Sequence, residues 1–344
     1  MTRRNRGSSV GDRPPSRRTL LRAAAVAALG VAGRSSWGVE AEPEPQAAPR
    51  FLLQWGRRGK APGEFDVPIA VAVDANDDVL VTDFRNARVQ RFSPDGAFRA
   101  ALAVGPFPSG LAVGRSGELY VSHFGFEGHP DRVTVHAPDG TLLREWGRSG
   151  KADGEFDMPG GIALGGEGGG RVYVADQTNR RVQVFDPKGA FLFSWGRYGV
   201  GPGEFGGNTG PKNRTGGPHF LAFNDRGEVF TTEASVGRVQ VFTPEGKFLR
   251  AWGNNDDKPG GFGGRPKNLP GPIGLCVDRA GRVWVGATSN RVQQFRPDGT
   301  YLRGFGVKGT APGEFNTPHG LALDRRGNLY VVDTLNCRVQ KFAV

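Results

Sequence analysis

The chain has 344 residues, of which 55 are glycine and 25 are proline, and 37% of all residues are hydrophobic. Many glycines together with regularly spaced Val, Leu, Phe and Trp indicate short strands and tight turns rather than helices. The formal net charge is +11, but residues 1–41 hold eight Arg against two acidic residues. The rest of the chain is only moderately basic, so charge gives no argument for nucleic-acid binding.

Residues 1–49 are interpreted as an export signal followed by a linker. The segment SRRTLLR at 16–22 precedes a short run of small apolar residues at 23–32 and then a polar stretch that contains Pro. Its paired arginines resemble the twin-arginine signal, which routes folded proteins across a bacterial inner membrane. The apolar run is too short to span a bilayer comfortably. We therefore expect an exported protein, periplasmic or extracellular, with no transmembrane segment in its mature part. A disordered basic tail is the alternative.

Residues 50–344 repeat one pattern six times. Its clearest unit is RVQxF or a close variant, with spacings of 44 to 57 residues between the starts at Arg88, Arg132, Arg181, Arg238, Arg291 and Arg338. Two short apolar segments precede each unit, as in LALD and LYVVD. A Pro-x-Gly turn, a segment such as FLFSWG and a Gly-rich connection ending in GEF follow most units. Four short strands at this period predict an all-β chain folded as a six-bladed β-propeller.

The ends of the repeat region predict how the ring closes. The sixth repeat stops at Val344, directly after its third strand. The missing fourth strand stands at the other end of the region, as FLLQWG at 51–56. We expect this N-terminal strand to complete the last blade, which leaves no free inner edge.

This order of segments resembles the NHL repeat over residues 50–344. The resemblance implies a six-bladed propeller but no single function, because propellers serve as enzymes, scaffolds and binding modules. The Arg of RVQ recurs in all six blades and is expected to be structural, as is the acid that ends the second strand in four of them, Asp83, Asp176, Glu233 and Asp333. Cys276 and Cys337 fall at positions that the repeat does not bring together, so no disulfide is expected.

Three histidines break the repeat. His219 and His319 follow the Pro that opens the innermost strand, and His123 replaces the acid at the end of the second strand. The loops before the first strand and after the second share one side of a propeller, here called the top face. Three imidazoles from alternating blades could hold zinc there with an open position for water or substrate. Ordinary polar residues near the mouth are the alternative.

The histidines also resemble the zinc site of peptidyl-α-hydroxyglycine amidating lyase, an enzyme class built on NHL propellers. That family takes its ligands from Pro-His-x-Leu segments, which His219 and His319 match, whereas Ser109 stands at the third position and His123 would have to substitute. The resemblance implies Arg85 for the arginine of the family, and blade three has no matching Tyr.

For a metal-assisted reaction, a group near the metal would have to move a proton. Arg85 and Glu233 are the catalytic candidates, with Asp83 beside them.

Two long segments before blades four and five share the sequence Pro-Lys-Asn. They carry the basic residues Lys212, Arg214, Arg265 and Lys267. Both precede an innermost strand, so we expect a basic rim on the top face that suits an anionic ligand. Solvated loops without a role are the alternative.

The sequence thus favours an exported binding or scaffold module that uses its top face. Its partner would be a protein, a peptide or an anionic ligand of the cell envelope, and nucleic acid is not expected. The alternative is a zinc-dependent lyase or hydrolase of the amidating-lyase kind, so the sequence leaves open whether the chain is an enzyme.

Overall fold

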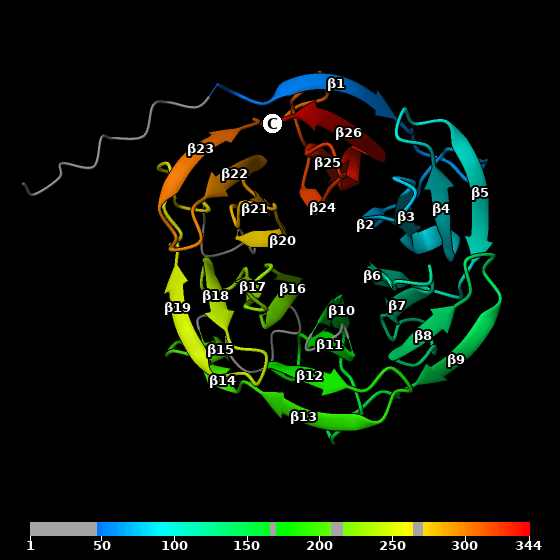
Figure 1. The fold of residues 1–344 in the computed structure, drawn as a ribbon, viewed down its shortest axis with the longest axis vertical. Coiled ribbons are helices and arrows are strands. Elements are labelled where there is room, and N and C mark those ends of the chain that lie inside the picture. The colour runs from blue at the N-terminus through cyan, green and yellow to red at the C-terminus, as the bar shows by residue number, and fades with distance from the viewer. Residues whose placement is uncertain (1–46, 166–169, 208–215, 264–270) are drawn as a thin grey trace, which may run out of the picture. The chain divides into compact units, whose positions relative to one another are not determined.

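The computed structural model describes residues 47–165, 170–207, 216–263 and 271–344. They form six four-stranded antiparallel sheets arranged as a ring around a central axis (Figure 1). The predicted six-bladed β-propeller is confirmed. No helix within the described ranges has the length and apolar character needed to cross a membrane.

Within the first five blades the strands run in chain order from the axis to the rim, and in the last blade β1 takes the outer position. The innermost strands are β2 (Pro68–Val73), β6 (Pro108–Val113), β10 (Pro159–Gly165), β16 (Pro218–Phe223), β20 (Pro272–Val277) and β24 (Pro318–Leu323). The second strands are β3 (Val79–Asp83), β7 (Leu119–His123), β11 (Arg171–Asp176), β17 (Val229–Glu233), β21 (Val283–Ala287) and β25 (Asn328–Asp333). The third strands are β4 (Arg88–Phe92), β8 (Arg132–His136), β12 (Arg181–Phe185), β18 (Arg238–Phe242), β22 (Arg291–Phe295) and β26 (Arg338–Ala343). The outer strands are β5 (Phe98–Ala103), β9 (Leu142–Trp146), β13 (Phe191–Trp195), β19 (Phe248–Trp252), β23 (Tyr301–Phe305) and β1 (Arg50–Trp55).

Three smaller features lie between these strands. The 3-10 helices η1 (Phe84–Asn86) and η3 (Thr334–Asn336) follow the second strands of blades one and six. The pair β14 (Tyr198–Gly199) and β15 (Phe205–Gly206) is parallel and lies in the connection from blade three to blade four.

The two ends of the described chain share the last blade. Strand β1 pairs with β26 in the sheet order β1-β26-β25-β24, with Phe51 opposite Phe342 and Trp55 opposite Val339. The predicted closure by the N-terminal strand is confirmed. In Figure 1, β1 and β26 lie side by side although they are the first and last strands of the chain.

The core lies between neighbouring blades. Trp55 of the last blade meets Phe92 of blade one with ring centroids 5.6 Å apart, and it covers Gly96. A Cβ at Gly96 would come within 2.9 Å of the indole, and the backbone there has φ +83°, so only glycine fits without strain. The same pairing of Trp with a turn glycine recurs at Trp146 and Gly189, Trp195 and Gly246, and Trp252 and Gly299. These tryptophans therefore pack between neighbouring blades.

A buried polar lattice fixes the preceding connection to the blade in blades one, three, four and six. In blade one the fully buried Asp83 accepts hydrogen bonds from Arg88 Nε at 2.9 Å and Gln90 Nε2 at 3.2 Å. Arg88 also donates to the carbonyl oxygen of Glu64, within the GEF connection, at 2.8 Å. The same Arg contact is made by Asp176, Glu233 and Asp333. The structural role predicted for the recurring Arg and acid is confirmed.

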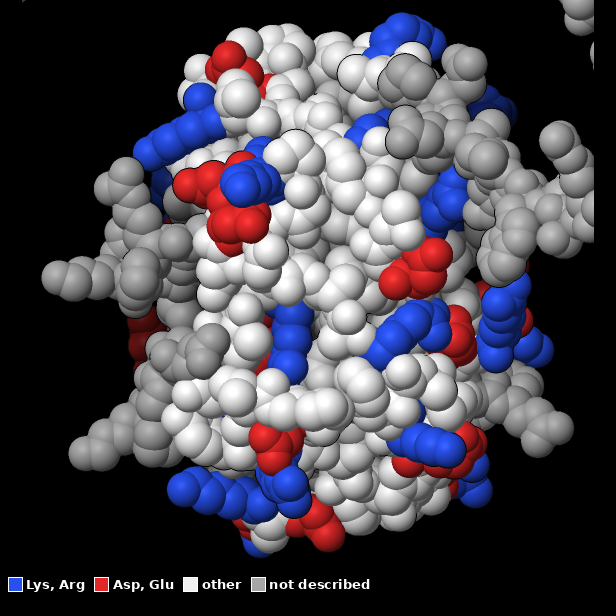
Figure 2. Space-filling view, turned by 90° about the vertical axis from the view of Figure 1, so that its left-hand side faces the viewer, with Lys and Arg blue, Asp and Glu red and all other residues white. Residues whose placement is uncertain are grey.

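The side of the ring carries mixed charge. Basic and acidic residues stand next to one another on the face that Figure 2 shows.

Both cysteines are free, as expected, with Cys337 buried in the core between blades six and one.

Candidate functional site

The strand register places the predicted site residues at the top end of the innermost strands. The Pro that opens each innermost strand lies opposite the last residue of the second strand, as in Pro218 with Glu233 and Pro318 with Asp333. His219 and His319 are the next residues along, so they stand at the mouth of the channel from blades four and six. Neighbouring innermost strands approach closely there, because a Cβ at Gly274 would overlap the His319 carbonyl oxygen.

The structure brings His219 and His319 together. The His319 ring packs edge-on against Phe220, with centroids 5.3 Å apart, and Phe220 is the residue after His219. The Nδ1 atom of His219 lies 3.3 Å from the Gly217 carbonyl oxygen. The Nδ1 atom of His319 is buried and has no hydrogen-bond partner among the described residues.

Both imidazoles of this pair are neutral near pH 7. Burial, with a smaller effect of the positive Arg180, lowers the pKa of His219 to about 4. Burial, followed by the neighbouring His219, lowers the pKa of His319 to about 3. A neutral imidazole offers one donor and one acceptor, so the pair suits hydrogen bonding to a ligand rather than charge pairing.

Phe220 closes the channel beneath the histidines. The residues at its slot in the other blades are small: Ala70, Gly110, Gly161, Gly274 and Gly320. Phe220 comes from blade four, yet it packs against the core between blades one and two, which includes Leu111, and against the core between blades four and five, which includes Leu275. A side chain that contacts both cores crosses the axis. The top mouth therefore has an apolar floor.

His123 does not belong to this site, so the prediction of three converging histidines is wrong. It is only 1% exposed, and both of its ring nitrogens are used inside blade two. Nδ1 lies 2.8 Å from the Pro106 carbonyl oxygen and Nε2 lies 2.8 Å from Thr134 Oγ1. Thr134 stands where other blades have the Gln of RVQ, so the two substitutions compensate. Burial lowers the pKa of His123 to about 3.

The residues at the mouth do not fit a zinc site of three ligands. The described residues contain no group of three or more His, Cys, Asp or Glu that could hold a metal ion. The segments 208–215 and 264–270, which precede β16 and β20, contain none of these residue types in the sequence. His219 and His319 would therefore have no third protein ligand of these types within the described blades or these two segments.

The catalytic candidates have other surroundings. Glu233 is fully buried in the lattice, where it accepts hydrogen bonds from Arg238 Nε at 2.7 Å and the Gly206 backbone N–H at 2.5 Å. Burial raises its pKa. Arg85 is exposed on η1, and its side chain makes no hydrogen bond or ion pair with any described residue. Lys212, Arg214, Arg265 and Lys267 lie outside the described residues, so the basic rim stays a prediction.

Sequence reasoning missed Arg180. It occupies the slot that Ala87 fills in blade one and Cys337 in blade six, and it adopts the same left-handed backbone with φ 60°. Its side chain is buried, and its charge acts on both His219 and Glu233. The signal was present, since a long cation replaces a small residue at one slot of the repeat.

An aromatic cluster on the top face was also missed. It consists of Phe84, Phe107, Phe124, Phe126 and His129, with ring centroids 5.2 to 6.1 Å apart. Four of the five residues come from blade two, where the stretch FGFEGHPD enlarges the loop after the second strand. This cluster and the histidine pair both break the repeat on the same face.

Comparison with known proteins agrees with the repeat and the ring. A family model for the NHL repeat matches residues 65–92 and 315–342. NHL repeat-containing protein 3 of Homo sapiens is 26% identical over 158 residues, which cover 31% of this chain and 46% of that protein. The Mus musculus protein of the same name is 29% identical over the same shares. The match thus spans about half the length of these relatives.

Solved structures share the fold at low identity. A structural genomics protein of Bacteroides thetaiotaomicron has a TM-score of 0.62 and 20% identity, covering 85% of this chain and 76% of its own. A gluconolactonase of Xanthomonas campestris has a TM-score of 0.56 and 17% identity, covering 87% and 96%. Virginiamycin B lyase of Staphylococcus aureus has a TM-score of 0.53 and 14% identity, covering 80% and 83%. These similarities concern the fold alone.

Proposed function

We propose that this chain, a β-propeller built of NHL repeats, is an exported binding module that takes a protein or peptide ligand on its top face. One observation carries the proposal: side chains that depart from the repeat gather on the top face, while the recurring polar side chains are used by the lattice. Propellers present such faces to many kinds of ligand, so the site rather than the fold has to identify the ligand.

The chemistry of the top face suits an extended peptide with apolar side chains. Phe220 gives the mouth an apolar floor, and the aromatic cluster around Phe107 adds an apolar surface beside it in the ring. The neutral His219 and His319 supply hydrogen-bonding atoms, including the Nδ1 of His319, which has no partner among the described residues. A few convergent polar groups in a mostly apolar site are typical of ligand pockets.

Selection from a displayed library of random peptides tests this proposal. We expect peptides enriched on residues 47–344 to bind about tenfold or more weakly to the His219→Ala/His319→Ala double variant and to Phe126→Ala. A matched control is Asp225→Ala, an exposed substitution in a turn at the other end of the channel. Peptides that bind all these proteins equally, or no enrichment at all, would contradict the proposal.

Export rests on the segment 16–22 and is tested separately. A reporter fused to residues 1–49 should reach the periplasm only in cells with a working twin-arginine translocase, and Arg17→Lys/Arg18→Lys should keep it in the cytoplasm. Export that survives the double substitution would contradict the proposed route.

An enzyme at the axial mouth is the second candidate. The observation in its favour is the pairing of His219 with His319, one of whose nitrogen atoms has no described partner. Metal analysis of purified protein separates the two functions. Because the described residues supply only two imidazoles, we expect metal-free protein, which favours the binding module. Near-stoichiometric zinc that is lost in the His219→Ala/His319→Ala variant would favour the enzyme.

A further inference from the structure

The bottom mouth of the channel is lined by the short turns that join the first and second strands. Five exposed arginines stand on four of these turns: Arg115, Arg226, Arg279, Arg325 and Arg326. They come from blades two, four, five and six, so only the closed ring brings them to one place. Phe220 separates this mouth from the histidines on the top face.

The nearest carboxylates are already used inside their own turns. Asp278 accepts hydrogen bonds from the Ala280 backbone N–H at 3.0 Å and from Arg282 Nε at 2.6 Å. Asp324 accepts hydrogen bonds from Asn328 Nδ2 at 2.8 Å and from the Tyr330 hydroxyl at 3.1 Å. These carboxylates are therefore not available to Arg279 or Arg325.

The arginines themselves are almost unpaired. Arg115, Arg226, Arg279 and Arg326 make no ion pair within the part of the chain that the structure describes. Arg325 has one long contact, 3.9 Å from its Nε to Asp77 Oδ1. The acids of the bottom turns that have no described ion pair are Asp74, Glu118 and Asp225. They are fewer than the five arginines, so positive charge predominates among the charged groups without a close ion pair.

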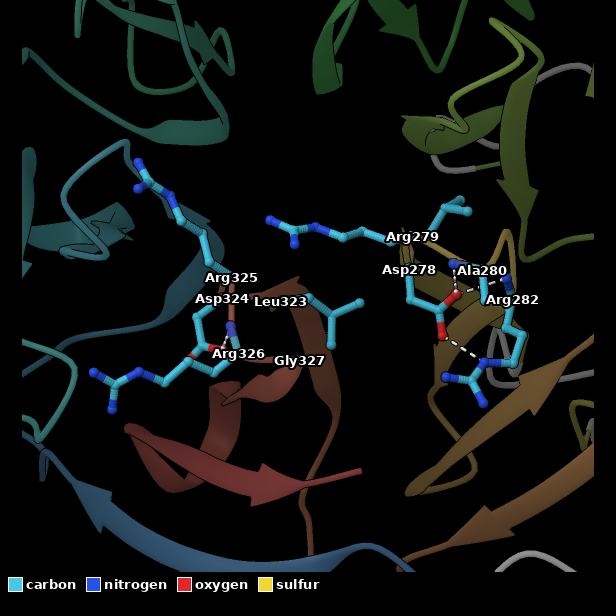
Figure 3. A pocket seen from close by; sticks show the side chains of 10 residues that line it. Asp278, Arg279, Ala280, Arg282, Leu323, Asp324, Arg325, Arg326 and Gly327 are labelled. Carbon is cyan, nitrogen blue, oxygen red and sulfur yellow. Dashed lines mark hydrogen bonds and ion pairs between the residues drawn. The ribbon is translucent and has the colours of Figure 1, made fainter.

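Pockets lie between these turns. One of about 440 Å³ lies between blades five and six, where Arg279, Arg325 and Arg326 line it. A pocket of about 290 Å³ continues from Arg325 to Arg115, and a smaller one of about 140 Å³ joins Arg279 to Arg226. In Figure 3, Arg279 extends from its turn toward the turn of blade six, whereas Arg282 folds back to Asp278.

We propose that the bottom mouth binds a small ligand that carries two or more phosphate or carboxylate groups. A planar guanidinium matches the oxygen atoms of both groups and stays charged at all relevant pH values. A concave site with one sign of charge concentrates the field and the anion. The size of the main pocket falls within the range of small-molecule sites, roughly 300–1,000 Å³.

Calorimetric titration at low salt with pyrophosphate and, in a second arm, citrate tests this inference. We expect saturable binding of one or both, and the arm that binds more tightly assigns phosphate or carboxylate. The variant Arg279→Gln/Arg325→Gln should weaken binding about tenfold or more, and added salt should weaken it further. Both residues are exposed, so the variant should melt as the parent protein does, which a thermal scan verifies.

The matched control is Arg57→Gln/Arg148→Gln. It removes the same charge from two highly exposed arginines in the connections on the top face, whose side chains are 81% and 78% exposed. Binding should be unchanged in this control. The inference is overturned if neither anion binds at millimolar concentration, or if both double variants lose affinity equally. Sedimentation with phosphatidylglycerol vesicles at physiological salt that depends on Arg279 and Arg325, without binding of either free anion, would instead assign a membrane surface and also overturn it.

Discussion

The polar side chains at the two mouths of the channel lie in opposite environments, buried at the top and exposed at the bottom. On the top face the acid or histidine that ends the second strand of a blade is buried and is neutral or engaged, as with His123 in blade two and Asp83 in blade one. At the bottom mouth, guanidinium groups such as Arg279 stand exposed on tight turns. The connections between blades arrive at the top, and their backbone groups need partners. The bottom turns satisfy their own backbone through one Asp, as Asp278 does, and leave their tips free. Candidate functional residues on the top face are therefore those that depart from the repeat. The turns at the bottom mouth, in contrast, can carry exposed charged side chains.

The largest effect should come from breaking the ring that creates both mouths. Deletion of residues 50–55 removes β1 and exposes the edge of β26. We expect the melting temperature to fall by at least about 10 °C, because a propeller blade cannot bury its faces alone. Circular dichroism during heating measures it. Deletion of residues 1–43 is the control, and an equal melting temperature for both proteins would refute the closure argument.

A buried lattice acid should matter far more than an exposed acid at the bottom. Asp333→Ala leaves Arg338 with an uncompensated buried charge, and we expect it to lower the free energy of unfolding by about 3–5 kcal/mol. Asp225→Ala, in a bottom turn, should change it by less than about 0.5 kcal/mol. Denaturant titration compares the two variants. Similar losses of unfolding free energy in the two variants would contradict the proposed difference between the top and bottom mouths.

His123 should give blade two its own dependence on pH. The pKa of His123 is about 3 in the folded chain and about 6.5 in the unfolded chain. Between these two values His123 is protonated in the unfolded chain but stays neutral in the folded chain. Stability should therefore fall as the pH drops from about 6.5 to about 3, by up to about 1.4 kcal/mol per pH unit for this group. His123→Gln should flatten the pH profile of unfolding relative to the parent protein, and an unchanged profile would contradict the buried neutral imidazole.

The smallest effect on stability is expected at the bottom mouth. Arg279→Gln/Arg325→Gln removes two exposed charges that repel each other and have no close partner, so the free energy of unfolding should change by less than about 0.5 kcal/mol. Denaturant titration measures this. A large loss of unfolding free energy would show that these arginines stabilise the ring, and it would argue against a role in ligand binding.

The sequence predicted the ring well because the same four-strand pattern recurs in every blade. The period and the displaced strand at 51–56 both follow from alignment of the copies, and the pairing of Phe51 with Phe342 confirms the closure. The candidate site was predicted less well. Register alone placed His219 and His319 correctly at the top mouth but could not show that His123 turns into the blade toward Thr134. Such a direction depends on the three-dimensional packing of neighbouring strands.

Two residues were overlooked although the repeat marked them. Phe220 and Arg180 are large residues in slots that hold small ones in other blades. What they do there depends on the space in the ring: Phe220 crosses the axis, and Arg180 reaches a neighbouring blade. Comparing residue size at equivalent positions of the repeat identifies such residues. Their contacts, however, are visible only in the closed ring.

The pairing of β1 with β26 also sets an order of events in synthesis. A ribosome makes Arg50–Trp55 at the start of the propeller and Arg338–Ala343 at its end, so the first outer strand has no partner until almost the whole chain has emerged. Early blades can form their own sheets while the chain grows, but the circle is completed only once β26 has been made. A chain cut short anywhere before β26 keeps an open sheet edge, which is an aggregation hazard and a mark by which quality control can distinguish unfinished molecules.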